Sequence, residues 1–226
     1  MTSDVTAVLN TIKDLQIFDD ELYFVGGTAL SYYLNHRISE DIDIVSIKIL
    51  EYKKIIPAML SLGAKKIEDE NIFALRLAGL VPDEYIIKFV IDGVKVEFFS
   101  ANRPIQKEIL QTLDFIRYEN SNLKVLDIKS IAKLKLVAFF GREKSRDLFD
   151  FGSMLEHKIL SLDEILYIAQ ESKNIKKKDD LVKFISIKQE PNNDEAVYLS
   201  EENRLNLSFE DIKKQVCLRL NSNYAI

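Results

Sequence analysis

Cysteine, proline and glycine are all scarce in this chain of 226 residues. The single cysteine, Cys217, excludes an intrachain disulfide and a metal cage built from cysteines, and favours a reducing compartment. Four prolines and seven glycines leave little material for long disordered linkers. No apolar run approaches the ~18 residues of a membrane span, and the acid-containing N-terminus does not read as a signal peptide. We therefore expect a cytoplasmic protein that does not associate with a membrane.

The composition is that of a globular protein, with 47% hydrophobic and 30% charged residues. The length suits one large domain or two small ones, either of which can bury a core. The formal net charge of -5 argues against a surface that attracts nucleic acid everywhere, although a local basic patch remains open.

Hydrophobic periodicity divides the chain into a mixed α/β half and a helical half. An Asp92-Gly93 pair between two β-rich runs indicates a hairpin. We expect an α/β domain over residues 1–123 and a helical domain over 124–226. The other strands are predicted at 22–25, 42–45 and 72–78, and the helices at 5–15, 28–35, 51–62, 128–140, 146–155, 163–171 and 209–220.

Two aspartates stand two residues apart within a predicted strand. Side chains at i and i+2 share one face of a strand, so Asp41 and Asp43 point the same way while Ile42 and Ile44 point into a core. A divalent cation relieves the repulsion between two such carboxylates, and Mg²⁺ is typically held by one or two carboxylates plus substrate phosphates. The alternative is an exposed strand with two solvated acids, and the triplet alone does not decide between them.

A Gly-Gly-Thr turn, Gly26 to Thr28, follows the apolar run that precedes these aspartates. Glycine lets a backbone approach a ligand closely, and a helix that starts there offers free N–H groups to phosphate oxygens. The Thr28 hydroxyl adds one more donor. Glycine also ends many strands for packing reasons, so the turn gains its meaning from the Asp-x-Asp pattern beside it.

A third carboxylate is expected from a neighbouring strand. Glu97 lies on the second arm of the predicted hairpin, with Val96 and Phe98 facing the opposite side. The alternative is a surface stripe formed by Lys95 and Glu97. If Glu97 is not the ligand, the substitutes are Asp92 and Asp83.

These residues resemble a known superfamily. Gly26-Gly27-Thr28 followed by Arg37-Ile38-Ser39-Glu40-Asp41-Ile42-Asp43-Ile44 is similar to the nucleotidyltransferases with the polymerase-β-like fold, and more narrowly to the AbiEii/AbiGii toxin family. Ile38 replaces the usual aromatic residue. The stretch KLKLVAFFGREKSRDLFDFGSML, residues 133–155, resembles the Lys-containing helix and Arg-Asp-x-x-Asp motif of the same family. The resemblance extends from about Leu22 to Leu155.

The resemblance implies an α+β fold, in which a mixed sheet flanked by helices is followed by a mostly helical C-terminal domain. It also implies an enzyme, the nucleotidyltransferase toxin of a toxin–antitoxin or phage-defence system with a cognate antitoxin protein. Such a toxin transfers nucleotides from an NTP, ATP among the candidates, to an acceptor, for which the family suggests the 3′ end of tRNA. Mg²⁺ is the expected cofactor.

Roles for individual residues follow from the resemblance. Asp41, Asp43 and Glu97 are the expected metal ligands, although most members have Asp at the third place. Gly26, Gly27 and Thr28 are expected to hold the triphosphate, and Arg37 and Ser39 either touch it or hold the loop before the aspartates.

The helical half supplies further candidates. Lys135 is expected to contact a phosphate, and the alternative is a solvated helix residue. Asp147 either orients Lys135 or binds the acceptor or the base, and the alternative is a surface ion pair with Arg146. Arg142 and Asp150 also fall on motif positions, and Asp150 is expected to brace the helix. His36 and His157 lack metal-ligand company, so both are interpreted as structural or incidental.

The stretch from 124 to 146 contains seven basic residues and only two acidic ones, Asp127 and Glu143. Such a run suits an RNA backbone or a polyphosphate, and equally a solvated helix face. Two further functions stay open: a nucleotidyltransferase for a small molecule such as an aminoglycoside, and a non-catalytic binding member of the fold. The basic residues are Lys124, Lys129, Lys133, Lys135, Arg142, Lys144 and Arg146.

Overall fold

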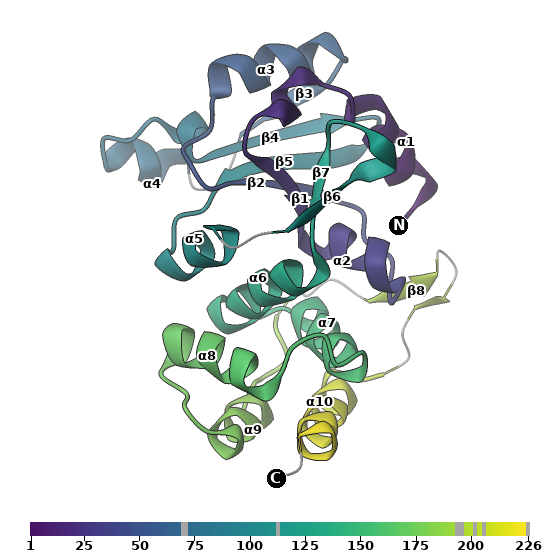
Figure 1. The fold of residues 1–226 in the computed structure, drawn as a ribbon, viewed down its shortest axis with the longest axis vertical. Coiled ribbons are helices and arrows are strands. Elements are labelled where there is room, and N and C mark those ends of the chain that lie inside the picture. Colours follow the sequence, from purple (N-terminus) through teal and green to yellow (C-terminus); the bar gives the residue numbers. More distant parts are fainter. Residues whose placement is uncertain (69–71, 112–113, 193–196, 201–202, 205–206, 225–226) are drawn as a thin grey trace. The chain divides into compact units, whose positions relative to one another are not determined.

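The computed structural model describes residues 1–68, 72–111, 114–192, 197–200, 203–204 and 207–224 (Figure 1). The chain forms two compact units, one of residues 1–33 and 39–127 and one of residues 34–38 and 128–226. The chain therefore passes between the units three times, and segment 34–38 belongs to the second unit although its neighbours in the sequence belong to the first. The predicted domains 1–123 and 124–226 stay a prediction, because a domain is a part of the chain that can fold alone.

The described residues of the first unit form a mixed seven-stranded sheet in the order β3-β4-β5-β2-β1-β7-β6. Strand β2 is central, antiparallel to β1 and parallel to β5, and β1 is parallel to β7. The remaining neighbours are antiparallel. The strands are β1 (Leu22–Val25), β2 (Ile42–Ser46), β3 (Lys65–Ile67), β4 (Ile86–Ile91), β5 (Val94–Ser100), β6 (Phe115–Arg117) and β7 (Lys124–Leu126).

One face of the central strands is fully buried. Ile42 and Ile44 of β2 and Val96 and Phe98 of β5 are 0% exposed, so the alternation read from the sequence holds along β5 and on either side of Asp43 in β2, while Val45 is buried as well. The predicted hairpin is confirmed: β4 and β5 pair around Asp92 and Gly93, whose φ angles of 50° and 81° suit a tight hairpin turn. The opposite face of β2 and β5 is only partly covered, and it carries Asp43 and Glu97.

Helices and short 3-10 turns connect the strands of the first unit. Helix α1 contacts β5 and helix α3 contacts β3. The bounds are α1 (Ser3–Ile12), α2 (Gly26–Leu34), α3 (Tyr52–Ser61), α4 (Ile72–Leu77), α5 (Pro104–Gln111), η1 (Gln16–Asp19), η2 (Pro82–Glu84) and η3 (Tyr118–Asn120).

The predicted strand at 72–78 is wrong, because this segment forms helix α4. A strand needs a neighbour for its backbone hydrogen bonds, whereas a helix satisfies its own. The segment IFALRL pairs with no described strand, and it contains good helix formers such as Ala, Leu and Arg. A short apolar run alone does not distinguish the two outcomes.

The second unit is mostly helical. Helix α6 packs against α7 and α8, and α10 packs against α7 and α9. Capping boxes fix the starts of two helices, Ser161 with Glu164 at α8 and Ser208 with Asp211 at α10. The elements are α6 (Ile128–Gly141), α7 (Ser145–Glu156), α8 (Leu162–Lys173), α9 (Lys178–Ser186), α10 (Phe209–Asn223), β8 (Tyr198–Ser200) and β9 (Asn203–Arg204).

Neither unit contains, within its described residues, a helix with the length and hydropathy needed to cross a bilayer.

Candidate active site

The turn between β1 and α2 brings a glycine directly against a carboxylate. Gly26 has a φ of 80°, a conformation that L residues with side chains rarely adopt. In the antiparallel register Val25 stands opposite Asp43, and a Cβ atom placed on Gly26 would lie 2.0 Å from Oδ2 of Asp43. Only glycine therefore leaves room for this carboxylate at the start of α2, where the free N–H groups of a helix favour negative charge.

Asp43 and Glu97 are neighbours on parallel strands, because they occupy the same register position of β2 and β5. Both are half-buried. Lys88 stands opposite Glu97 on β4, and the Nζ atoms of Lys88 and Lys95 lie 3.3 and 3.4 Å from Oε2 of Glu97. The structure thus places Asp43 and Glu97 side by side, with two ammonium groups beside the glutamate.

Asp41 is half-buried and lies immediately before the first residue of β2. The two substitutes for Glu97 lie elsewhere. Asp92 is exposed in the hairpin turn, and Asp83 pairs with Lys66, with 2.6 Å between Oδ2 and Nζ.

Carboxylate oxygens of this kind fit a hard divalent cation, and Mg²⁺ takes only one or two of them together with phosphate oxygens. Among the described residues, no group of three or more His, Cys, Asp and Glu side chains is arranged to hold an ion by itself. The donors beside Gly26 therefore fit a cation that is shared with a phosphate ligand.

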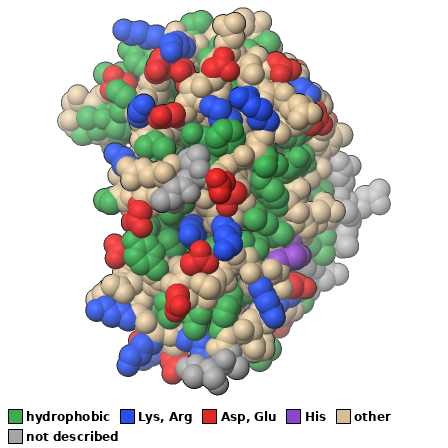
Figure 2. Space-filling view, viewed as in Figure 1, with side chains coloured by type: hydrophobic (Ala, Val, Ile, Leu, Met, Phe, Trp, Pro, Cys, Tyr) green, Lys and Arg blue, Asp and Glu red, His purple; other side chains and the backbone are tan. Residues whose placement is uncertain are grey.

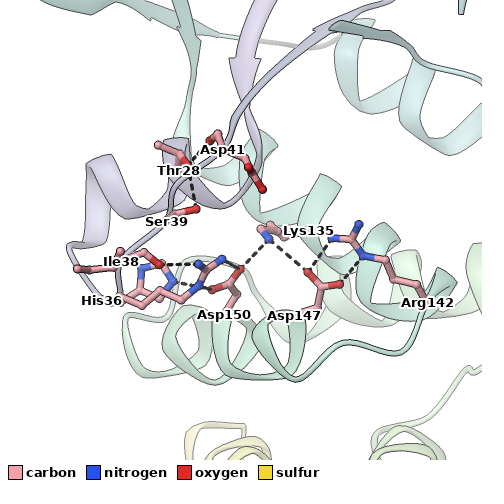
Figure 3. Close-up of polar contacts among 10 residues, drawn as sticks. Thr28, His36, Ile38, Ser39, Asp41, Lys135, Arg142, Asp147 and Asp150 are labelled. Atoms are coloured by element: carbon pink, nitrogen blue, oxygen red, sulfur yellow. Dashed lines mark hydrogen bonds and ion pairs between the residues drawn. The ribbon is translucent and has the colours of Figure 1, made fainter. Parts of the chain in front are cut away.

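Thr28 and Ser39 brace the loop before β2 from within the first unit (Figure 3). The Thr28 hydroxyl contacts the Asp41 carbonyl oxygen and lies 2.8 Å from the Ser39 hydroxyl. A hydroxyl carries one proton and a carbonyl only accepts, so Thr28 donates to Asp41 and accepts from Ser39. Both side chains are buried, 0% and 6% exposed, and their hydroxyl groups are used inside the protein.

A buried cluster of charges occupies the second unit, centred on Asp150 of α7. The Asp150 carboxylate, which is 0% exposed, accepts hydrogen bonds from Nε and Nη2 of Arg37 at 2.6 and 3.0 Å. Its oxygens also lie 2.7 Å from Nζ of Lys135 and 2.7 Å from Nε2 of His36. Burial alone raises the pKa of Asp150, but Lys135, Arg37 and His36 together hold that pKa well below its usual value.

Asp147, one turn earlier on α7, joins the same cluster. Its carboxylate lies 3.3 Å from Nζ of Lys135 and accepts hydrogen bonds from Arg142 at 2.6 and 3.1 Å. Burial raises the pKa of Asp147, and Lys135 and Arg142 outweigh burial and hold the pKa below its usual value. Lys135, 8% exposed, thus lies between two ionised carboxylates, so the structure places it in a buried ion-pair cluster of the second unit.

Sequence reasoning missed the part that His36 plays. Its Nε2 atom donates to the Asp150 carboxylate, and its ring stacks on Phe149 with 6.1 Å between centroids. Nothing near His36 in the sequence signals this contact, because Asp150 is 114 positions away. The i, i+3 spacing of Asp147 and Asp150, in contrast, did indicate one shared helix face.

Many of the basic residues between 124 and 146 are engaged inside the protein. Lys124 is 9% exposed and donates to the backbone carbonyl oxygens of Asp19 and Asp20, and Lys133 pairs with Glu164 at 3.1 Å. Lys135 and Arg142 belong to the cluster just described. On the face drawn in Figure 2, Lys and Arg side chains are interspersed with Asp and Glu side chains. The basic run in the sequence therefore does not translate into an equally basic surface.

Comparison with solved structures identifies the fold. The fold matches the crystal structure of a putative nucleotidyltransferase from H. pylori, with a TM-score of 0.53, 17% identity and coverage of 99% of this chain and 96% of that one. It also matches MenT4, a nucleotidyltransferase toxin from Mycobacterium tuberculosis H37Rv, with a TM-score of 0.54, 13% identity and coverage of 99% and 83%. Likeness at such identities establishes the fold alone, and the predicted α+β nucleotidyltransferase fold is confirmed.

The family follows from the sequence match. Residues 8–214 match the model of the nucleotidyl transferase AbiEii toxin family, type IV toxin–antitoxin system, and the chain belongs to this family. An uncharacterized protein from Aquifex aeolicus (strain VF5) is 25% identical over 157 residues, which cover 70% of this chain and 68% of that protein. The predicted membership of the AbiEii toxin family is therefore confirmed, over a longer part of the chain than the motifs alone had indicated.

Proposed function

We propose that this protein is a Mg²⁺-dependent nucleotidyltransferase toxin that transfers a nucleotide from an NTP to the 3′ end of tRNA. The single observation that carries the proposal is the placement of Asp43, which stands beside Glu97 in register and against Gly26 at the start of α2. Carboxylates beside a phosphate-binding helix start are what a metal–triphosphate substrate requires. The family adds the toxin role and, with it, a cognate antitoxin.

In this proposal the cation would be shared between the triphosphate oxygens and ligands drawn from Asp41, Asp43 and Glu97. When bound, it would neutralise the triphosphate and the charge that develops on the attacking and leaving oxygens. The N–H groups of Gly26 and Gly27 bind phosphate oxygens. The acceptor hydroxyl attacks the α-phosphorus, the bond to pyrophosphate breaks, and Glu97 receives the proton of the hydroxyl. Lys135 keeps its predicted role as a phosphate contact. For Asp147, predicted either to orient Lys135 or to bind the acceptor or the base, the 3.3 Å between its carboxylate and Nζ of Lys135 supports the orienting role.

The test is incubation of the purified protein with each labelled NTP, total tRNA and Mg²⁺. We expect label on tRNA, and we expect Asp43→Asn to lower the rate by about 10²-fold or more, because a group that stabilises charge in the transition state is lost. Asp4→Asn, the same change at an exposed position of α1, is the matched control and should retain the wild-type rate.

Other outcomes identify the alternatives. Label on an aminoglycoside but not on tRNA would replace the acceptor and keep the chemistry. Growth inhibition by the Asp43→Asn variant at the wild-type level, with no label transferred by either protein, would favour a non-catalytic binding protein. Co-expression of an antitoxin should restore growth if the toxin role is correct.

A further inference from the structure

A five-residue segment of the second unit directly precedes the proposed metal ligands. Residues 34–38, here called the anchor segment, leave the first unit after Tyr33 and return to it at Ser39. Asp41 follows only three positions after Ile38, and β2 begins at Ile42. Contacts that fix the anchor segment therefore limit the conformations open to the chain that leads to Asp41 and Asp43.

Three sets of contacts hold the anchor segment inside the second unit. The Arg37 guanidinium forms a bidentate pair with Asp150 and also donates from Nη1 to the Ile38 carbonyl oxygen at 2.8 Å. His36 donates to the same carboxylate. The Ile38 amide donates to the Tyr198 carbonyl oxygen of β8 at 2.8 Å. The segment is thus fixed through side chains and backbone together.

Both groups of the Arg37–Asp150 pair are buried. Arg37 is 4% exposed and Asp150 is 0% exposed, so removing the Asp150 carboxylate would deprive the buried guanidinium of its counter-charge. Removing Arg37 would leave the buried carboxylate with Lys135 and His36. A planar guanidinium that donates to both oxygens of a carboxylate is held in one orientation, and a lysine at this position would not reproduce this bidentate geometry.

The loop that continues from the anchor segment is held at its other end too. In the first unit, the buried Thr28 hydroxyl contacts both the Ser39 hydroxyl and the Asp41 carbonyl oxygen. The chain from His36 to Asp41 is therefore fixed by Asp150 near its start and by Thr28 near its end. Figure 3 shows both groups of contacts.

We infer that Asp150 and Arg37 are positioning residues, which fix the anchor segment so that Asp41 and Asp43 are ordered for the metal-bound triphosphate. The inference rests on the proposed function, and it assigns Arg37 a role different from direct phosphate binding. Its Nε and Nη2 atoms donate to Asp150 and its Nη1 atom donates to the Ile38 carbonyl oxygen, which suits a structural hold on the segment.

The first test is amide hydrogen exchange of the metal-free and nucleotide-free protein. Arg37→Met removes the guanidinium and keeps the aliphatic stem, and we expect exchange over residues 36–43 to become at least about tenfold faster, because local opening follows the loss of buried contacts. Arg37→Lys should recover only part of the protection. Lys133→Met, which breaks the α6 to α8 ion pair with Glu164, is the matched control and should leave exchange over residues 36–43 unchanged.

The second test is a double-mutant cycle read as the Mg²⁺ concentration for half-maximal nucleotidyl transfer. We expect Arg37→Met to raise this concentration about tenfold, while kcat at saturating Mg²⁺ changes less. An effect of this size lies within the range of coupling energies measured between contacting residues. In an Asp150→Asn background, Arg37→Met should have little further effect, because Arg37 acts through Asp150. Additive effects of the two substitutions would instead indicate that Arg37 contacts the substrate, and would overturn the inference.

The two tests separate failure of the inference from failure of the proposed function. If folded Arg37→Met protein shows wild-type exchange over residues 36–43, the anchoring is wrong, whether or not the protein transfers nucleotides. If exchange rises while the Mg²⁺ requirement of an active enzyme is unaltered, the anchoring is present and its role in positioning is wrong. A wild-type protein that transfers no nucleotide would overturn the proposed function, and with it the ordering of Asp41 and Asp43 for a triphosphate. The exchange result would still decide whether Arg37 and Asp150 fix the anchor segment.

Discussion

At the scale of single residues, the contact between Gly26 and Asp43 connects backbone conformation to proposed chemistry. The positive φ of Gly26 starts helix α2, and the missing side chain leaves space that the Asp43 carboxylate fills. The sequence indicated a glycine for the close approach of a ligand. In the structure the group that approaches is a carboxylate of the protein itself.

Gly26→Ala should destabilise the protein by about 3 kcal/mol or more, because it combines a positive φ with an overlap against Asp43. The matched control is Gly63→Ala. Gly63 has nearly the same φ of 81°, and a Cβ atom there would meet nothing within 4 Å. The control should lose only about 1 kcal/mol. Urea unfolding of the two variants and the wild type measures the difference, and equal losses would contradict the overlap.

Asp150 should also govern stability in acid. Its pKa in the folded protein is held well below the value of about 3.9 that an aspartate has in an unfolded chain. A lowered pKa stabilises the folded state above the unfolded pKa, and this contribution is lost as the pH falls through the folded pKa. We expect Asp150→Asn to cost about 3 kcal/mol at pH 7, since three cationic or hydrogen-bonding partners lose their carboxylate, and to cost progressively less below about pH 4. Urea unfolding at pH 7 and at pH 3 tests this, and a cost that does not change with pH would contradict it.

At the scale of elements, the helices of the first unit differ in how much of their surface is buried. Helix α3 buries Ile55 and Met59, whereas α4 buries none of its residues and exposes 70% of Phe73 and 74% of Leu77. The sequence predicted a helix at 51–62, where α3 lies, but predicted a strand at 72–78, where α4 lies. The pattern identified elements well where one face meets a core, and poorly where no core imposes a period.

Substitutions in α4 should therefore hardly affect stability. We expect Phe73→Ser and Leu77→Ser each to change the free energy of unfolding by less than about 0.5 kcal/mol, as at other surface positions. Ile55→Ala, at a position that is 1% exposed, should cost about 2–5 kcal/mol. Thermal or urea unfolding compares the three variants. A large loss from the α4 variants would show that its apolar side chains are covered in solution.

At the scale of the whole molecule, charge pairing limits how many basic side chains could contact an RNA backbone. The chain carries 31 basic and 36 acidic residues, and four of the seven basic residues between 124 and 146 have the intramolecular partners described above. An RNA backbone would find few basic side chains in this run that are not already engaged. If the acceptor is the proposed tRNA end, its recognition must depend less on phosphate contacts than the sequence suggested.

The dependence of the proposed tRNA modification on salt should accordingly be shallow. Each phosphate contact to single-stranded nucleic acid contributes a slope of about -0.7 to the dependence of log K on log salt concentration. With about two such contacts, the KM for tRNA should rise less than about tenfold between 50 and 200 mM salt. Steady-state kinetics over this range provides the measurement. A rise of several hundredfold would reveal a basic surface that forms on binding.

The sequence by itself determined the central strands, the hairpin at Asp92-Gly93 and most long helices, because period, turn residues and helix ends are local properties. It also determined the family, through motifs that survive as short runs of residues. It placed Asp43 and Glu97 on strands expected to be adjacent, which the parallel register of β2 and β5 then made specific.

Only the tertiary structure decided which charges meet. Arg37 and His36 lie more than 110 positions from Asp150 in the sequence. The pairing of Lys135 with both Asp147 and Asp150 likewise depends on how α6 and α7 pack. The same holds for the exchange of segment 34–38 into the second unit. Pairing between distant residues depends on how helices and strands pack after they form, and a charge left without a partner in the interior is too costly to persist, so the fold, and not the local sequence, selects the partner.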